Sequence, residues 1–166
     1  MSVVDNPMQR VCIELGSNIE PAVNIPRAAA LLHDYFTVLA ISSAWETPPV
    51  GCTGCGNYIN AAMLIESSAT AEALKTQLRA IESQLGRVRT NDKFAAPTID
   101  LDVLLIDDVL IEPDLWKYAH LAVPVAELLP ELQQPQDGRR LCDLANDLLA
   151  ETPITLRAEV LLNPPQ

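Results

Sequence analysis

The sequence predicts an α+β fold in which helices pack on one face of an antiparallel sheet. Segments with strand or helix periodicity follow in the order strand, helix, strand, strand, helix, strand, with a helical and strand-like tail. The 166 residues are enough for one domain with a full core and too few for two. A content of 49% hydrophobic and 20% charged residues is typical of a globular protein. This order matches the ferredoxin-like split βαβ arrangement, which leaves the other sheet face to a ligand.

In the first half of the chain, apolar residues alternate in some segments and recur at helical spacing in others. Alternation predicts strands, and recurrence every three or four residues predicts helices. Pro26 is tolerated only in the first turn of its helix, and Gly86 ends the next one. After a loose start over 1–9, strands are expected at 11–15, 38–46 and 58–66, and helices at 21–34 and 69–85.

The second half opens with a strand at 97–106 that is rich in Ile, Val and Leu, and Pro97 is tolerated only at its start. We expect all 166 residues to form a single domain. The remaining expected elements are a short strand at 109–111, a helix at 125–132 broken by Pro130, a helix at 141–149 and a last strand at 154–162.

Asp100 and Asp102 lie in the 97–106 strand and, being two residues apart, share one of its faces. Two neighbouring carboxylates repel each other unless a positive group neutralises them. Hard oxygen ligands of this kind are suited to a divalent cation such as magnesium. The alternative is an edge strand whose acidic face is simply solvated.

A basic cluster of Arg87, Arg89 and Lys93 stands shortly before this acidic pair. Cations beside metal-binding carboxylates suit a nucleoside triphosphate, because they stabilise charge on the transferring group. No Walker loop or dinucleotide motif is present. Taken alone, the cluster is better explained as a solvated loop after a helix, where cations are also favoured.

Two further groups of residues have side chains that suit a ligand. Tyr58 and Asn60 begin a strand on the same face, where a ring and an amide can stack on and hydrogen-bond a heteroaromatic ligand. A surface tyrosine and a turn asparagine are the alternative. Trp116, Lys117, Tyr118 and His120 form a dense polar and aromatic segment, for which a packed loop is the plainer interpretation.

The charge and the cysteines exclude several classes of function. A formal net charge of -11 disfavours nucleic acid and anionic membranes as partners. Neither a membrane span nor a signal peptide is evident, which predicts a cytoplasmic protein. In that compartment the four cysteines are expected to be free thiols. Cys52 and Cys55 have the spacing of a zinc or redox motif, but there is no second pair and no helix start to support either interpretation.

Taken together, these residues resemble the 6-hydroxymethyl-7,8-dihydropterin pyrophosphokinase family over residues 11–132. The resemblance rests on Leu-Gly-Ser-Asn (15–18), Thr-Pro-Pro-Val-Gly (47–51), Asn-Tyr-Ile-Asn-Ala-Ala (57–62), Ile-Glu (81–82), Gly-Arg-Val-Arg (86–89), Pro-Thr-Ile-Asp-Leu-Asp-Val-Leu-Leu (97–105) and Pro-Val-Ala-Glu-Leu-Leu-Pro-Glu-Leu (124–132).

The resemblance implies a folate-pathway enzyme that moves pyrophosphate from ATP to the pterin hydroxymethyl group and releases AMP. It implies that Asp100 and Asp102 hold two magnesium ions, and that Arg87 and Arg89 act with them in catalysis. The expected pterin-binding residues are Thr47, Pro48, Val50, Tyr58, Asn60, Phe94 and His120. The expected ATP-binding residues are Glu82, Arg87, Arg89, Lys93, Val103 and Lys117. ATP and the pterin are the expected partners of a monomer.

The chain also departs from the family pattern. Phe94 replaces a usual Trp, Pro97 replaces a frequent Arg, and the segment between Leu115 and Leu121 is shortened. We expect Lys117 to replace the lost charge and His120 to replace a missing aromatic residue. The shortening leaves one alternative open, a weak or inactive homologue that binds pterin or nucleotide.

Overall fold

The computed structural model describes residues 6–87 and 99–162. Within them, the chain forms a seven-stranded sheet in which neighbouring strands pair antiparallel. The strands are β1 (Gln9–Ser17), β2 (Thr37–Ile41), β3 (Trp45–Thr47), β4 (Tyr58–Ser67), β5 (Asp100–Ile106), β6 (Val109–Leu110) and β7 (Thr155–Leu156). Their order is β6-β5-β1-β4-β3-β7, and β2 also pairs with β4.

Four α-helices accompany the sheet in the described ranges, with one 3₁₀ turn. They are α1 (Pro21–Tyr35), α2 (Ala71–Gln84), α3 (Ala119–Leu128) and α4 (Leu141–Glu151), and the 3₁₀ turn is η1 (Pro113–Trp116). The side chain of Thr70 caps α2, and Gly86, at φ 89°, follows its end. No described helix has the length and apolar character needed to cross a membrane. The α+β class is confirmed, whereas the ferredoxin-like assignment stays a prediction.

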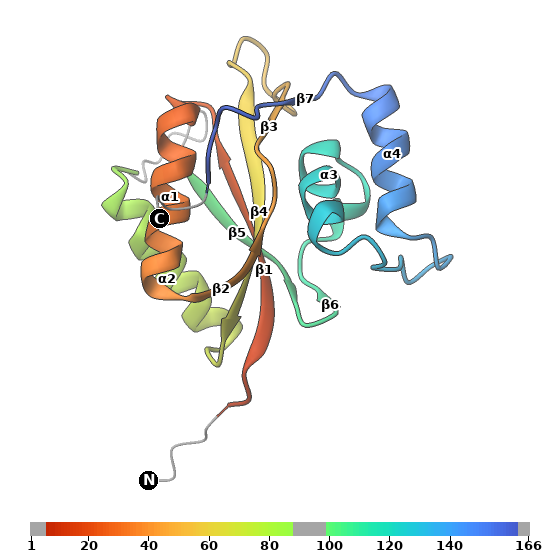
Figure 1. Cartoon of the computed structure of the whole chain (residues 1–166). Coiled ribbons are helices and arrows are strands. Elements are labelled where there is room, and N and C mark those ends of the chain that lie inside the picture. Colours follow the sequence, from red (N-terminus) through yellow and green to blue (C-terminus); the bar gives the residue numbers. More distant parts are fainter. Residues whose placement is uncertain (1–5, 88–98, 163–166) are drawn as a thin grey trace, which may run out of the picture.

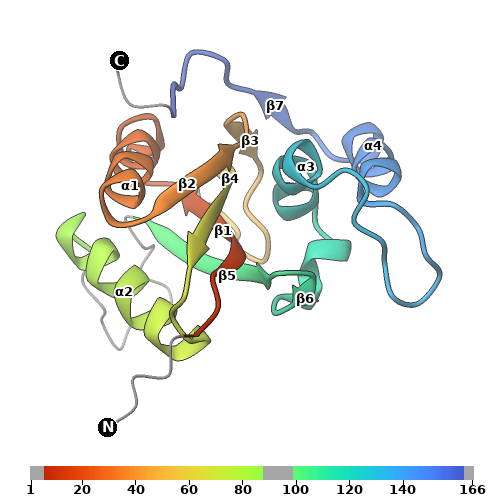
Figure 2. The same cartoon turned by 60° about the horizontal axis from the view of Figure 1, so that its bottom comes forward.

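Helices cover both faces of the sheet, with α1 and α2 on one side and α3 and α4 on the other (Figures 1 and 2). The alternation of β1 produces this division. Ile13 and Leu15 pack in the core beneath α1 and α2, whereas Cys12 packs in the core beneath α3 and α4. The expectation that helices occupy one face only is therefore wrong. The apolar residues of α3 and α4 are buried by packing against the second face of the sheet.

The α3 helix begins earlier than the sequence predicted, at Ala119 rather than at residue 125. It ends at Leu128, before Pro130, and so agrees with the predicted break. Its first half is nearly all apolar because it is buried between the sheet and α4, and this composition concealed the helical periodicity.

Two strand predictions were also inaccurate. The expected strand at 38–46 is divided into β2 and β3, and both pair with β4. The expected strand at 154–162 is reduced to β7. Beyond β7, Val160 and Leu162 are buried in the core beneath α1, so their apolar character reflects core packing rather than strand pairing.

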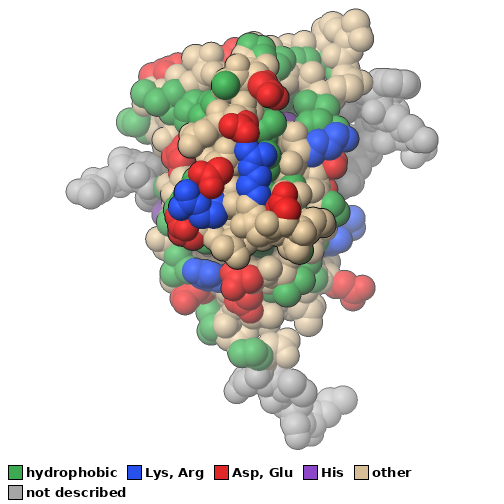
Figure 3. Space-filling view, turned by 90° about the vertical axis from the view of Figure 1, so that its right-hand side faces the viewer, with side chains coloured by type: hydrophobic (Ala, Val, Ile, Leu, Met, Phe, Trp, Pro, Cys, Tyr) green, Lys and Arg blue, Asp and Glu red, His purple; other side chains and the backbone are tan. Residues whose placement is uncertain are grey.

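Charged side chains of both signs intermingle on the face that carries α4 (Figure 3). The Arg140 guanidinium binds the Asp143 carboxylate, with Nε to Oδ2 at 3.0 Å, and also contacts Glu131. Arg139 forms an ion pair with Asp147. These contacts attach the turn before α4 to the helix itself.

Candidate active site

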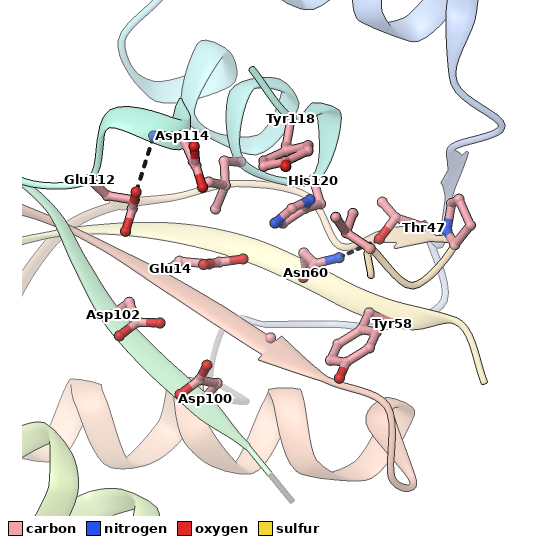
Figure 4. A pocket seen from close by; sticks show the side chains of 14 residues that line it. Glu14, Thr47, Tyr58, Asn60, Asp100, Asp102, Glu112, Asp114, Tyr118 and His120 are labelled. Atoms are coloured by element: carbon pink, nitrogen blue, oxygen red, sulfur yellow. Dashed lines mark hydrogen bonds between the residues drawn. The ribbon is translucent and has the colours of Figure 1, made fainter. Parts of the chain in front are cut away.

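A pocket of about 370 Å³ opens between the sheet and the start of α3 (Figure 4). Its floor follows from strand register. Gly16 of β1 pairs with Asn60 of β4 and with Asp100 of β5, and Glu14 pairs in the same way with Asp102. These residues line the pocket from the sheet, whereas Tyr118, just before α3, and His120, in its first turn, line it from the other side.

The pocket is strongly acidic. Among the described residues, no lysine or arginine lines it, whereas five carboxylates do: Glu14, Asp100, Asp102, Glu112 and Asp114. Partial burial and the nearby charge of Asp100 raise the pKa of Asp102 to about 6. Burial, followed by the charges of Asp102 and Asp100, raises the pKa of Glu14 well above its usual range. An anionic substrate therefore needs a cation to enter.

The acidic pair suits magnesium that also binds a phosphate ligand. No cluster of three or more metal-ligating side chains exists among the described residues, so the protein would supply Asp100 and Asp102 and leave further positions open. Magnesium is commonly held by one or two carboxylates, with phosphates and waters completing its shell. The donors present fit such an ion.

Glu82 and Arg87 link α2 to the start of β5. Arg87 Nη1 donates hydrogen bonds to Glu82 Oε1 at 2.7 Å, to Asp100 Oδ1 at 2.6 Å and to the Ile99 carbonyl at 3.1 Å. Glu82 Oε1 also accepts from the Leu101 backbone N–H at 2.9 Å. Glu82 is only 2% exposed, so its carboxylate lies inside the protein and not in solvent. This network fixes one carboxylate oxygen of Asp100, Oδ1, against the Arg87 guanidinium.

The opposite end of the pocket is built around Asn60. Its Nδ2 donates to Thr47 Oγ1 at 2.7 Å, and both residues are buried. This bond leaves Asn60 Oδ1 as an acceptor above Gly16. Pro48, Val50 and Tyr58 also line this part of the pocket. Burial and the charge of Asp100 raise the pKa of Tyr58, so its phenol stays neutral.

His120 faces the pocket across from Asn60 and Tyr58 (Figure 4). Its ring stacks on Tyr118 with centroids 5.5 Å apart, and burial lowers its pKa, which favours the neutral imidazole. Lys117 Nζ lies 4.6 Å from the Tyr118 ring centroid. Within the described structure, Lys117 is not among the residues that line the pocket.

A second cavity, also of about 370 Å³, adjoins the first at Asp100 and Asp102. Arg87 and Val103 line it, together with Lys75 and Arg79 of α2, which the sequence analysis did not single out. Their spacing of one helical turn from each other was an available signal. Glu14 was also missed, although a glutamate between apolar residues of a core strand is unusual.

Three of the predicted site residues, Arg89, Lys93 and Phe94, lie outside the described residues, as does Pro97. The prediction for the cysteines is wrong in part. Cys52 and Cys55 form a disulfide, whereas Cys12 and Cys142 are free. Gly51 and Gly54, both with positive φ, let the loop fold back so that the bonded Cα atoms are 5.8 Å apart.

Replacing Glu82 by alanine is expected to cost about 2–4 kcal/mol of unfolding free energy, because it leaves Arg87 and the Leu101 N–H without this acceptor. Urea unfolding measures the effect. Glu72→Ala, at an exposed position in the first turn of the same helix, is the control and should cost less than about 1 kcal/mol. Equal losses in the two variants would contradict this account.

Asp102 should make the metal-free protein less stable as pH rises. Its pKa in the folded protein, about 6, exceeds the ordinary value of 3.8. The contribution of Asp102 to stability is therefore fully present below pH 3.8 and is lost as the pH rises through about 6. Asp102→Asn should therefore raise the melting temperature by about 2–5 °C near pH 8 and much less near pH 4.

Thermal melts in a chelator test this expectation, with Asp108→Asn, whose side chain is 81% exposed, as the control. If Asp102→Asn shows the same pH dependence as the unaltered chain, the carboxyl group is not perturbed.

Residues 12–130 match the family described as 7,8-dihydro-6-hydroxymethylpterin-pyrophosphokinase (HPPK). The 2-amino-4-hydroxy-6-hydroxymethyldihydropteridine pyrophosphokinase of Bacillus subtilis is 32% identical over 133 residues, which are 74% of this chain and 79% of that protein. A folate synthesis bifunctional protein of Arabidopsis thaliana is 30% identical over 77% of this chain and 28% of its own length.

The fold is also found in solved structures. The HPPK-DHPS protein of Plasmodium falciparum superimposes with a TM-score of 0.70 at 11% identity, over 89% of this chain and 44% of that one. At this identity the likeness concerns the fold alone. The family match over most of the chain and the identity to the Bacillus protein show that this chain belongs to the HPPK family.

Proposed function

We propose that this chain transfers pyrophosphate from ATP to the hydroxymethyl group of 6-hydroxymethyl-7,8-dihydropterin, as a step of folate biosynthesis. The products are the pterin diphosphate and AMP. Besides membership of the family, one observation carries the proposal: Asp100 and Asp102 line the same pocket as Asn60. Carboxylates suited to a metal-bound triphosphate thus face an amide suited to a heterocycle.

Binding without turnover is not favoured as an alternative. It was motivated by the shortened segment between Leu115 and Leu121. That segment still contributes Tyr118 and His120 to the pocket wall, so the wall is present despite the shortening.

For the pterin, the proposal assigns Asn60 to the ring amide and Tyr58 and His120 to the two ring faces. Asn60 is held by Thr47, so its orientation is fixed before the ligand arrives. Pro48 and Val50, on the loop after β3, would close the pyrimidine end of the pocket. Phe94 is proposed as a further stacking residue.

ATP is proposed to bind in the second cavity, because positive side chains line this cavity and because it shares Asp100 and Asp102 with the first. Val103 and Arg87 would contact the nucleotide there, and Glu82 would orient Arg87. Lys75 and Arg79 add positive charge to the same cavity. Arg89, Lys93 and Lys117 are proposed as further contacts to ATP.

Asp100 and Asp102 are proposed to hold two magnesium ions. When bound, magnesium supplies charge neutralisation to the phosphates of ATP. Arg87 adds a fixed positive charge beside Asp100, and Arg89 is proposed to do the same from the segment that follows.

The reaction would be an in-line displacement. The hydroxymethyl oxygen forms a bond to the β-phosphorus, the bond from that phosphorus to the oxygen of the α-phosphate breaks, and AMP leaves with that oxygen. The hydroxyl proton would pass to solvent, and Asp100, which lines both cavities, is proposed to orient that hydroxyl group.

We further propose that residues 1–166 act as one domain and as a monomer in the cytoplasm. The partners would be the two small-molecule substrates, without nucleic acid or membrane.

Asp100→Ala and Asp102→Ala should each lower kcat/KM by about 100-fold or more, because several kcal/mol of charge stabilisation would be lost. AMP release that depends on the pterin is the measurement. Asp108→Ala, in the turn after β5, removes an equal charge at an exposed position and should leave the rate unchanged. The proposal is falsified if both pocket variants keep full activity.

Lys117→Ala should raise the KM for ATP by about threefold to tenfold without changing the KM for the pterin, because one phosphate-directed charge is removed. Steady-state kinetics with each substrate varied in turn provides the measurement. If kcat and the KM for ATP do not change, Lys117 does not contact the nucleotide, and Lys75 and Arg79 supply the positive charge instead.

A further inference from the structure

Glu14 brings into the pocket a carboxyl group to which the proposed function gives no role. It lies in the middle of β1, one residue pair away from Gly16 on the same face, and its side chain points along the floor beside Asn60 (Figure 4). Within residues 6–87 and 99–162, neither a hydrogen-bond donor nor a cation is paired with it. Its charged neighbours are the carboxylates Asp102, Asp100 and Glu112.

Gly16 brings the Glu14 carboxyl group and the Asn60 amide together. A Cβ atom built on Gly16 would lie 3.1 Å from Asn60 Oδ1 and 3.7 Å from Glu14 Oε1. Both oxygens therefore border the same bare stretch of backbone. The Asn60 Nδ2 group is committed to Thr47, which leaves Asn60 Oδ1 and the Glu14 carboxyl group available to a ligand on this floor.

An unsatisfied carboxyl group among other carboxylates is unfavourable in the free protein. A group held in such a place gains most from a ligand that supplies its missing hydrogen bond. The pterin ring has ring nitrogens, N–H groups and a carbonyl oxygen along its edges, and all of them lie in the ring plane.

Strand register determines where Glu14 stands relative to a bound ring. Asn60, Gly16 and Asp100 form one cross-strand row, and Glu14 belongs to the next row, beside Asp102. A ring with its amide at Asn60 and its hydroxymethyl group at Asp100 would span the Gly16 row. Glu14 would then face the edge that joins these two ends of the ring.

We infer that Glu14 is a pterin-binding residue, which hydrogen-bonds the ring edge next to Asn60 and so sets how far the hydroxymethyl group reaches toward Asp100. This inference rests on the proposed function, because it concerns the acceptor of that reaction. A glutamine at this position has the same shape and both donates and accepts, so it should preserve the contact, whereas leucine should abolish it.

The experiment compares Glu14→Gln with Glu14→Leu. Calorimetry measures binding of the hydroxymethyl pterin to the full chain with magnesium and a non-hydrolysable ATP analogue, after the affinity for that analogue has been measured alone. Glu14→Leu should weaken pterin binding by about tenfold or more, and Glu14→Gln by less than about threefold. Affinity for the nucleotide analogue should be the same in all three proteins.

Kinetics should show the same pattern. The pterin KM should rise in Glu14→Leu, the ATP KM should not change, and kcat should fall because the hydroxyl is held less accurately. Circular dichroism monitors folding, and Glu14→Ala replaces the leucine variant if that variant does not fold.

The possible outcomes separate the two proposals. If the unaltered chain does not bind the pterin, the proposed function itself fails. If it binds and Glu14→Leu binds equally well, Glu14 is not a pterin contact. If both Glu14 variants weaken the nucleotide analogue and leave the pterin unaffected, the carboxyl group acts at the metal and the inference is overturned.

Discussion

The site depends on the register with which β1 pairs to β4 on one side and to β5 on the other. This double pairing sets Asn60, Gly16 and Asp100 in one row and Glu14 and Asp102 in the next. A slip of one residue in either ladder would turn the acidic pair or the amide into the core beneath α1 and α2. The apolar residues between them, such as Leu15 and Leu101, oppose that slip because they are buried on the other face. The hydrophobic core and the polar site are thus specified by the same alternation.

The parts of the site that could be predicted from sequence are those that depend on local periodicity. Asp100 and Asp102 share a face because they are two residues apart in a strand, and the same reasoning placed Tyr58 and Asn60 together. Prediction failed where position depends on distant contacts. Helix α3 begins earlier than predicted because its apolar first half gives no polar face. The contacts of Glu82 could not be predicted, because its partners, Arg87 and the Leu101 N–H, come later in the chain.

Charge in the pocket explains why two kinds of cation are needed. The carboxylates that line the pocket would repel a triphosphate, and Arg87 is already engaged by Glu82 and Asp100. Metal held by the acidic pair would act at the boundary between the two cavities, and the side chains of Lys75 and Arg79 would add positive charge from the second cavity. Sequence reasoning singled out the acidic pair and missed Lys75 and Arg79, since residues on a helix are brought to a strand only by tertiary packing. The Cys52 and Cys55 pair was misjudged because loop conformation, rather than spacing, brings the two thiols together.

The path of the chain after α4 has a mechanical consequence. After β7 pairs with β3, the backbone N–H of Arg157 bonds the Ala44 carbonyl, and Val160 and Leu162 enter the core beneath α1. The C-terminal segment therefore connects the layer of α3 and α4 to the layer of α1 and α2 on the other face of the sheet. Separation of either layer from the sheet would disrupt the contacts of this segment with the other layer. The pocket wall that carries His120 and the floor that carries Asn60 should therefore unfold as one cooperative unit.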